Sequence, residues 1–169
     1  MTEKLRVAER GQVLEFTFSD LMRYHGPGSP GGVATAFKVL QRALPLLDPD
    51  GPCERREISI VTAFGGPGAR DGFEMVTRAV TDERYLIDAS LAQPALGRAR
   101  ERFVFRLTYR ERSATLVLRE GFVTEEFIDL ARAGNRSSEE EAKLDRMKLD
   151  LAERVMSRPA TEVYDASAG

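Results

Sequence analysis

Two glycine- and proline-rich segments, each followed by a helical pattern, constrain the fold of this chain more than any other feature. The first segment, residues 24–32, reads Y-H-G-P-G-S-P-G-G and contains the single histidine of the sequence, His25. The second, residues 63–70, reads A-F-G-G-P-G-A-R and follows an apolar run that is typical of a covered strand. Glycine tolerates the backbone conformations of tight turns that other residues avoid. If both loops lie on one side of the fold, they form one site.

Hydrophobic periodicity and turn residues predict an α+β fold with a small mixed or antiparallel sheet, packed helices and a helical C-terminal third. We expect helices at about residues 20–25, 33–45, 71–80, 125–133 and 138–157, the last of them long and amphipathic. Strands are expected at residues 57–64, 85–88, 103–109 and 114–119, and the last two form a hairpin. Ser19, Thr124 and either Ser137 or Ser138 are the expected helix caps.

The domain organisation predicted from the sequence is simple. Residues 1–15 are a lead-in and residues 16–165 are a single domain, because no repeat, low-complexity segment or sustained heptad pattern divides the chain. Pro159 is expected to end the long helix. The segment T-E-V-Y-D that follows it either adds an edge strand or crosses the surface.

Composition limits the classes of partner. The 25 basic and 27 acidic residues are spread along the sequence, so we expect no nucleic-acid partner, which would need a basic surface. A single cysteine, Cys53, excludes a disulfide within the chain and a paired-cysteine zinc site. Neither a signal-peptide pattern nor an apolar run of about 18 residues is present. We therefore expect a cytoplasmic protein with no membrane partner.

The two loops are candidate binding elements for an anion. A helix start preceded by glycines offers unpaired backbone N–H groups at the positive end of the helix dipole. The residues expected to contact a ligand are Gly26, Gly28, Ser29, Gly31, Gly32, Gly66, Gly68 and Arg70. Neither loop has the P-loop pattern or the glycine spacing of a dinucleotide fingerprint. The simpler interpretation, in which the glycines only permit tight turns, stays open.

His25 and Asp71 are the candidate catalytic residues. A histidine beside a glycine loop can act as a general base, a hydrogen-bond donor or a metal ligand, although a lone histidine near a helix end is often structural. A metal needs three or more ligands, and the nearby sequence adds only Ser29, Asp71 and Glu74 to His25. Asp71 lies just inside a predicted helix start, where an acidic residue is also favoured without any catalytic duty.

The first loop and its helix resemble a known family. H-G-P-G-S-P-G-G followed by V-A-T-A-F-K-V-L resembles the opening H-G-H-x-C-P-G motif and Ala/Gly-rich helix of the FmdE-like family, which takes its name from a component of formylmethanofuran dehydrogenase. The segment I-S-I-V-T-A-F-G-G-P-G-A-R-D resembles the family's strand, loop and aspartate-bearing helix. The predicted hairpin and the tail E-V-Y-D extend the likeness over most of the chain, from about residue 16 to residue 164. His25, Pro30, Gly31 and Asp71 match, whereas Pro27 and Ser29 replace the family's second histidine and its cysteine.

The resemblance implies an α+β core, a homodimer and a pocket at His25 and the second loop. On this basis we expect a protein that binds a small ligand, anionic or one-carbon-related, between the two loops, with His25 as the proton carrier if it is an enzyme. The alternative is a non-catalytic accessory or structural homodimer with a degenerate transition-metal site, because serine is a poor metal ligand. The zinc-ribbon appendage of some members is absent, since no cysteine follows Cys53. The formyl chemistry of the dehydrogenase is attributed to its other components, so the resemblance implies no activity by itself.

Overall fold

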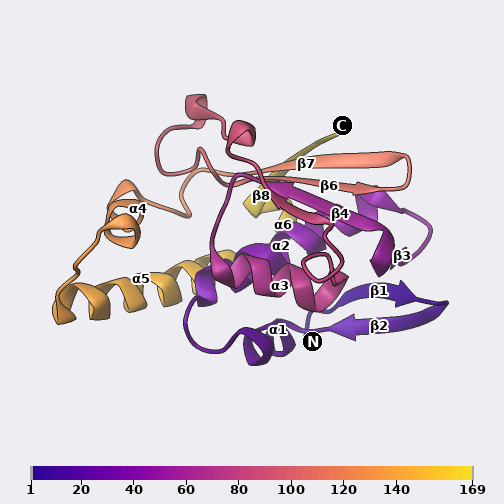
Figure 1. The fold of residues 1–169 in the computed structure, drawn as a ribbon, viewed down its shortest axis with the longest axis horizontal. Helices are drawn as coiled ribbons and strands as arrows, with labels where there is room; N and C mark the ends of the chain where they lie inside the picture. Colours follow the sequence, from indigo (N-terminus) through magenta and orange to yellow (C-terminus); the bar gives the residue numbers. More distant parts are fainter. Residues whose placement is uncertain (1, 169) are drawn as a thin grey trace.

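Two sheets and six α-helices make up residues 2–168, the part of the chain that the computed structural model describes, which confirms the predicted α+β class. Figure 1 shows the larger sheet above helices α2 and α3, with α1 and the β1–β2 hairpin below them. In chain order the elements are β1 (Leu5–Glu9), β2 (Gln12–Phe16), α1 (Phe18–His25), α2 (Pro30–Leu47), β3 (Cys53–Glu54), the 3-10 turn η1 (Arg55–Glu57), β4 (Ile58–Thr62), α3 (Pro67–Thr77), β5 (Tyr85–Ile87), the 3-10 turns η2 (Ala89–Leu91) and η3 (Pro94–Leu96), β6 (Val104–Tyr109), β7 (Arg112–Leu118), α4 (Glu125–Arg132), α5 (Ser138–Met156), α6 (Ala160–Val163) and β8 (Tyr164–Ala168).

The larger sheet has the strand order β5-β4-β6-β7-β8. Strand β5 is parallel to β4, and the other neighbouring pairs are antiparallel. Side chains alternate between the two faces of a strand, so Phe105 and Leu107 of β6 are buried while Arg106 between them is exposed. Helix α2 packs on the buried face, and the sheet and the helices share one hydrophobic core.

Helix α2 lies at the centre of the molecule, where it contacts α1, α3, α5, α6 and the larger sheet. Its side chains are buried on almost every side, and alanines such as Ala34 and Ala36 let its neighbours approach closely. Both α2 and α3 begin earlier than predicted, at Pro30 and Pro67, because proline suits the first helical position. Among residues 2–168, no helix combines the length with the hydrophobicity that a membrane crossing requires.

Residues 1–15, predicted only as a lead-in, include β1 and all but the last residue of β2, two strands that were not predicted from the sequence. Strands β1 and β2 form an antiparallel hairpin, and β1 also pairs with β3 in a second, three-stranded sheet. The hairpin turns at Arg10 and Gly11, which both have positive φ, as a tight two-residue turn requires. Only Leu5 and Val7 of β1 are buried. With two inward apolar residues between charged ones, the strand signal was too weak to see in the sequence.

Side-chain caps set the starts of three helices. Thr17, not the predicted Ser19, caps α1: its hydroxyl accepts from the Asp20 N–H while the Asp20 carboxylate accepts from the Thr17 N–H at 2.8 Å. Thr124 caps α4, as predicted, and Ser137, the first of the two predicted alternatives, caps α5. Beyond α6, the C-terminal segment takes the first of its two predicted alternatives and forms the edge strand β8, which continues past residue 165.

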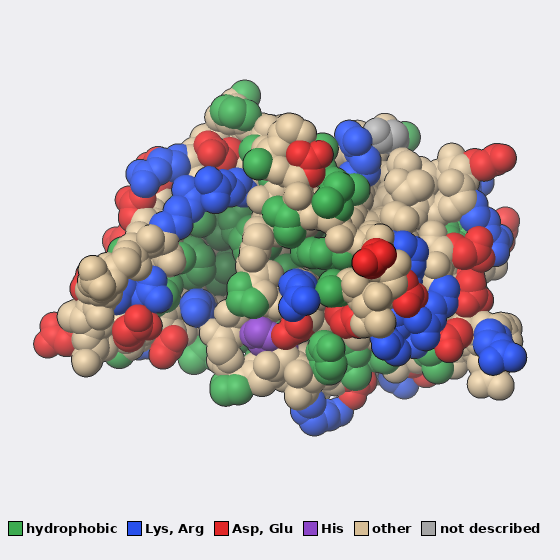
Figure 2. Space-filling model, in the orientation of Figure 1, with side chains coloured by type: hydrophobic (Ala, Val, Ile, Leu, Met, Phe, Trp, Pro, Cys, Tyr) green, Lys and Arg blue, Asp and Glu red, His purple; other side chains and the backbone are tan. Residues whose placement is uncertain are grey.

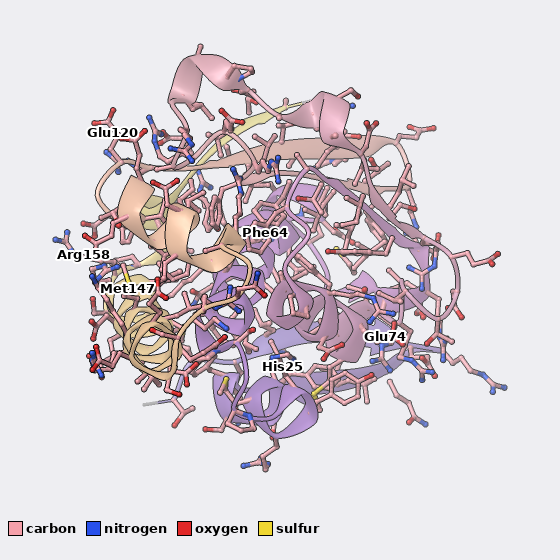
Figure 3. All side chains as sticks on the ribbon, turned by 60° about the vertical axis from the view of Figure 1, so that its left-hand side comes forward. His25, Phe64, Glu74, Glu120, Met147 and Arg158 are labelled. Carbon is pink, nitrogen blue, oxygen red and sulfur yellow. The ribbon has the colours of Figure 1, made fainter. Side chains whose placement is uncertain are left out.

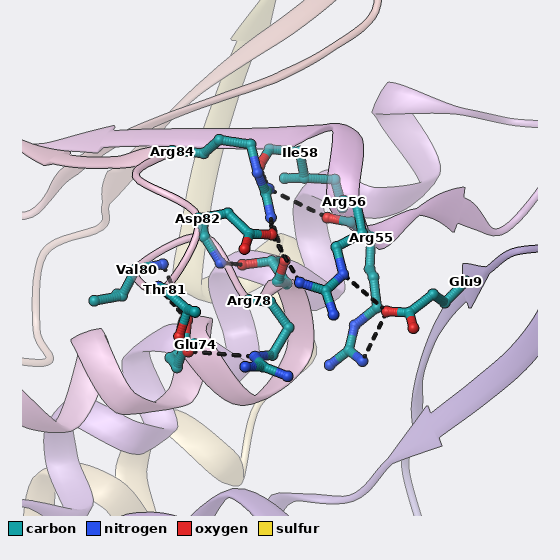
Figure 4. Close-up of polar contacts among 12 residues, drawn as sticks. Glu9, Arg55, Arg56, Ile58, Glu74, Arg78, Val80, Thr81, Asp82 and Arg84 are labelled. Atoms are coloured by element: carbon teal, nitrogen blue, oxygen red, sulfur yellow. Dashed lines mark hydrogen bonds and ion pairs between the residues drawn. The ribbon is translucent and has the colours of Figure 1, made fainter.

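The C-terminal end of α3 is held by two arginines from neighbouring segments (Figure 4). Arg55 donates to the carbonyl oxygens of Met75 at 2.6 Å and Val76 at 2.9 Å. Arg84 donates to the carbonyl of Thr77 at 2.8 Å. The last carbonyls of a helix have no partner within it and carry partial negative charge, so cations here both satisfy and stabilise them. They fix the end of α3 against β4 and the small sheet.

A buried carboxylate holds the loop that follows α3. Glu74 accepts from the backbone N–H of Val80 at 3.0 Å and of Thr81 at 3.1 Å. The Thr81 hydroxyl and the Arg78 guanidinium, at 3.4 Å, also donate to it. One side chain therefore satisfies two backbone donors in a segment that has no regular secondary structure of its own.

Candidate functional site

Both glycine-rich loops line one cavity of about 430 Å³. Its other wall comes from helices α4 and α5, which project away from the larger sheet (Figure 1) and which we call the α4–α5 arm (residues 125–151). Figure 2 shows the cavity as a hollow lined by hydrophobic side chains, with basic side chains along its border. A concave site of this volume is within the range of small-molecule pockets. The fold thus brings the two loops to one side of the molecule, next to a helical segment from the last third of the chain.

The lining of the cavity combines an apolar floor with a basic rim. The apolar lining residues are Phe64, Ala99, Phe103, Phe127, Ile128, Ala131, Leu144 and Leu151. Four basic side chains, Arg102, Arg132, Arg136 and Lys148, also line it. Within residues 2–168, no aspartate or glutamate is part of the lining. This composition favours a ligand that has an apolar body and a negative charge.

The four basic residues differ in how far the protein already uses them. Arg136 caps the end of α4 by donating to backbone carbonyls, at 2.8 Å for Ala133, and it also pairs with Glu141. Lys148 donates to a carbonyl oxygen of the first loop at 3.2 Å. Arg102 and Arg132 form neither an ion pair nor a side-chain hydrogen bond with any residue between 2 and 168. These two arginines are therefore the cations that are free for a ligand.

The starts of α2 and α3 add backbone donors to the same cavity. The N-cap residues, Ser29 and Gly66, make no side-chain hydrogen bond to the first turn of their helices. The first N–H groups of a helix have no partner within it. Three residues in the first turns of α2 and α3 line the cavity, namely Gly31, Gly32 and Gly68. Their N–H groups lie at the positive ends of the two helix dipoles. Both helix dipoles therefore add to the positive potential of the rim.

The glycines of both loops also serve close packing between helices. A Cβ atom at Gly32 would lie 2.9 Å from the backbone nitrogen of Ala69, and one at Gly68 would lie 3.0 Å from that of Val33. A Cβ at Gly31 would lie 2.9 Å from the side chain of Leu151 on α5. Real Cβ atoms avoid such distances, so α2 can approach α3 and α5 this closely only where glycine is present. The sequence suggested turns or ligand contacts at these positions, and close helix packing was not foreseen.

His25 and Asp71 form a contact of their own outside the cavity lining. The Nδ1 of His25 lies 2.8 Å from Oδ2 of Asp71, which joins α1 to α3. The His25 side chain is only 8% exposed, and its Nε2 has no hydrogen-bond partner among residues 2–168. In Figure 3, His25 lies towards α1 whereas Phe64 of the cavity lies towards α4. We expected His25 at the pocket between the two loops, but the structure places it outside the cavity lining.

The predicted ligand-binding residues fall into two groups. Ser29, Gly31, Gly32, Gly66 and Gly68 line the cavity. Gly26, Gly28 and Arg70 do not: Gly26 ends α1 with a φ of 90°, and Arg70 lies beside Asp71 at 3.9 Å. Sequence analysis missed the contribution of the α4–α5 arm. The only sequence signal was an amphipathic helix pair that carries arginines close to its apolar face.

The donor set around His25 does not suit a transition metal. Within residues 2–168, no group of three or more His, Cys, Asp or Glu side chains is placed to hold a metal ion. Asp71 occupies the Nδ1 side of the ring, and structural or catalytic metal sites need at least three protein ligands. Cys53 is buried in β3, where burial raises the pKa of its thiol to about 12. The thiol is therefore protonated and unreactive at neutral pH.

No family model matches the chain, and no curated protein matches it significantly. The likeness to the FmdE-like family thus stays a prediction from the quoted motifs, and the function of the cavity is inferred from its own geometry.

Proposed function

We propose that this protein binds a small molecule with one anionic group and an apolar body in the cavity between the two glycine-rich loops and the α4–α5 arm. The observation that carries the proposal is the pair Arg102 and Arg132, which face an apolar hollow without an acidic partner among the described residues. An uncompensated pair of guanidinium groups suits a carboxylate or phosphate, which accepts two hydrogen bonds at once.

The size of the cavity refines the expectation of a one-carbon-related ligand. A formyl group alone would fill a small part of 430 Å³ and would leave apolar surface in contact with water. A one-carbon unit bound here would therefore be part of a larger carrier molecule. We assign affinity mainly to the apolar floor, because charges at an exposed rim are screened by salt. The arginines then set the orientation of the ligand and the preference for an anion.

His25 does not take part in this binding proposal. An imidazole with one nitrogen bound to a carboxylate and the other unpaired has the arrangement of a general base. Its Nε2 atom is buried, however, so a ligand in the cavity does not reach it. We propose that the contact between His25 and Asp71 holds the first loop in position on the side that faces away from the cavity. The opposite side of the same loop lines the cavity.

Calorimetric titration with octanoate tests the proposal, with octanamide as the uncharged match. We expect octanoate to bind at one site and about tenfold more tightly than octanamide. The double variant Arg102→Gln, Arg132→Gln should lose most of that preference, since one charge-assisted hydrogen bond contributes about 1.5 kcal/mol.

The control for the titration is the double variant Arg112→Gln, Arg146→Gln, which removes the same charge outside the cavity and should bind like the wild type. Equal affinity for the acid and the amide, or unchanged binding by the first double variant, would contradict the proposal.

A homodimer is the second candidate, and we propose strand β5 as its contact. This short strand lies at the edge of the larger sheet and exposes Leu86 by 58% and Ile87 by 48%. An exposed apolar edge strand can pair with a copy of itself. Light scattering at high micromolar concentration should give twice the monomer mass, and Leu86→Lys should give the monomer. A monomeric wild type, or a dimer that persists in Leu86→Lys, would oppose this contact, and Val13→Lys on β2 is the control.

A further inference from the structure

The cavity carries more positive charge than a single carboxylate can neutralise. Four basic side chains line it, along the border visible in Figure 2, and no aspartate or glutamate of residues 2–168 does. Of the four, only Arg136 has a carboxylate partner, Glu141, at 2.9 Å. Arg102, Arg132 and Lys148 form no ion pair with any residue in the described part of the chain. Three uncompensated positive charges therefore border one apolar hollow.

Lys148 is held against the first loop at both ends of the residue. Its ammonium donates to the Gly28 carbonyl oxygen at 3.2 Å, and its own carbonyl oxygen lies 3.2 Å from the position of a Cβ atom on Gly31. An ammonium group has three N–H donors, so two remain for a ligand. The bond to a neutral carbonyl also leaves the positive charge of Lys148 in place. The start of α2 is therefore next to a lysine that is fixed in position but not neutralised.

The backbone beside Lys148 adds further donors. A Cβ atom on Gly32 would lie 3.1 Å from Cα of Gly68, so the first turns of α2 and α3 are in contact. The N–H groups of Gly31, Gly32 and Gly68 have no acceptor among residues 2–168. Helix starts alone would not define a site. Here they line the same cavity as the three uncompensated cations, and they add to its attraction for an anion.

A phosphate monoester suits this arrangement better than a carboxylate does. A carboxylate has one charge and two oxygens in one plane, which pair best with a single guanidinium. A phosphate monoester carries close to two charges at neutral pH and has three acceptor oxygens. The three cations come from separate segments, since Arg102 precedes β6, Arg132 ends α4 and Lys148 lies in α5. A tetrahedral dianion can accept hydrogen bonds from several such segments at once.

We propose that the anionic group of the ligand is a phosphate monoester, bound as the dianion by Lys148 together with Arg102 and Arg132. The apolar body of the same molecule fills the hollow that Phe64 and Phe127 help to line. The inference rests on the proposed function, because it names the anion that the basic rim selects. It assigns the ligand to the apolar phosphate monoesters and gives Lys148 the role of recognising the second negative charge.

Calorimetric titration with octyl phosphate and octyl sulfate tests the inference, because the two probes share a chain and a tetrahedral group and differ in charge. At pH 8 and low ionic strength, where exposed charges are least screened, the phosphate should bind about fivefold to tenfold more tightly, the effect of two or three exposed charge contacts. At pH 5 the phosphate is mainly a monoanion, and the preference should disappear. The described lining contains no histidine or carboxylate, so the change of pH acts on the probe, and octyl sulfate reports any effect on the protein.

Lys148→Gln removes the charge but keeps an N–H donor for the Gly28 carbonyl, so the first loop should stay in place. Its preference for octyl phosphate at pH 8 should fall to about twofold, because one of the three charge contacts is lost. The control Arg146→Gln, on the same helix but outside the cavity lining, should keep the wild-type preference.

Three results would overturn the inference: equal affinity for the two probes in the wild type at pH 8, a preference that persists at pH 5, or an unchanged preference in Lys148→Gln. If octanoate still binds more tightly than octanamide in that case, the proposed function stands. If no alkyl anion binds, both fail.

Two further probes separate a free ester from other sources of phosphate. Inorganic phosphate should bind more than about tenfold more weakly than octyl phosphate, because it buries no apolar surface. Vesicles of phosphatidylcholine that contain phosphatidic acid should not displace octyl phosphate, because the lipid chains remain in the bilayer. Inorganic phosphate that binds as tightly as the ester, or vesicles that displace it, would contradict the assignment to a free monoester.

Discussion

Gly68→Ala is expected to lower the free energy of unfolding by about 3 kcal/mol, the upper part of the range for overpacking. The new Cβ would lie 3.0 Å from Cβ of Ser29 and from the backbone nitrogen of Val33, and closer still to the carbonyl oxygen of Ser29. Two of these three obstacles are backbone atoms at the start of α2, so a side-chain rotation cannot relieve the clash. Alanine normally gains about 1 kcal/mol over glycine within a helix, and the clash should exceed that gain.

Urea denaturation measures this effect, with Gly134→Ala as the matched control. Gly134 has no heavy atom within 4 Å of an added Cβ and no positive φ, so its replacement should change stability by less than about 0.5 kcal/mol. Because Gly68 lines the cavity and contacts the cap of α2, the variant should also bind octanoate more weakly than the wild type. If Gly68→Ala is as stable as the control, then α2 and α3 do not approach each other as closely as described.

Glu74→Ala is the second change with a large expected effect, a loss of about 3 kcal/mol in the free energy of unfolding. The Glu74 carboxylate accepts hydrogen bonds from the backbone N–H groups of Val80 and Thr81, which have no other acceptor among residues 2–168. Alanine leaves both donors unsatisfied beneath the loop, and Arg78 loses its ion-pair partner. Thermal unfolding followed by circular dichroism should show the loss as a Tm lower by about 9 °C.

The Glu74 effect should depend on pH in a defined direction. Burial by itself would raise the pKa of Glu74, but the hydrogen bonds from Thr81 and then from Arg78 outweigh it and lower the pKa below its usual value of 4.5. A carboxylate whose pKa is lower in the folded state stabilises that state above the unfolded pKa, and the contribution is lost as pH falls through the folded pKa. The difference between wild type and Glu74→Ala should thus be largest near pH 7 and shrink in acid.

Glu153→Ala is the control for the pH series, because Glu153 is an exposed glutamate on α5 whose side chain makes no hydrogen bond or ion pair within residues 2–168. It should remain within about 0.5 kcal/mol of the wild type across the series. A Glu74 variant that loses stability equally at pH 7 and pH 3 would contradict the role assigned to the ionised carboxylate.

Local sequence signals predicted most of the helices and strands. Thr124 and Ser137 cap their helices as expected, and the hairpin of β6 and β7 follows from alternating apolar residues, because caps and alternation involve neighbours a few residues apart. The β1–β2 hairpin was missed since its stability comes from pairing with β3 and from burying only two side chains against distant helices. Tertiary contacts can stabilise a strand whose own pattern is weak.

The candidate site was likewise only partly predictable from the sequence. Its two loops were visible in the sequence because glycine and proline clusters mark turns directly. The role of the glycines was not, since the atoms that exclude a Cβ at Gly32 and Gly68 belong to the opposite helix. Arg132 was equally hidden, because nothing in a chain with 25 basic residues distinguishes it from the others.

By itself the sequence determined the α+β class, the approximate positions of helices α1 to α5 and strands β4 to β7, and the presence of two glycine-rich loops that each precede a helix. Only the tertiary structure decided that His25 meets Asp71, 46 residues away, and that α4 and α5 close the cavity beside both loops. The physical reason is the separation along the chain over which each kind of interaction acts. Hydrophobic periodicity, capping and turn formation depend on residues within one or two helical turns, whereas the partners of a buried side chain depend on how the whole core packs.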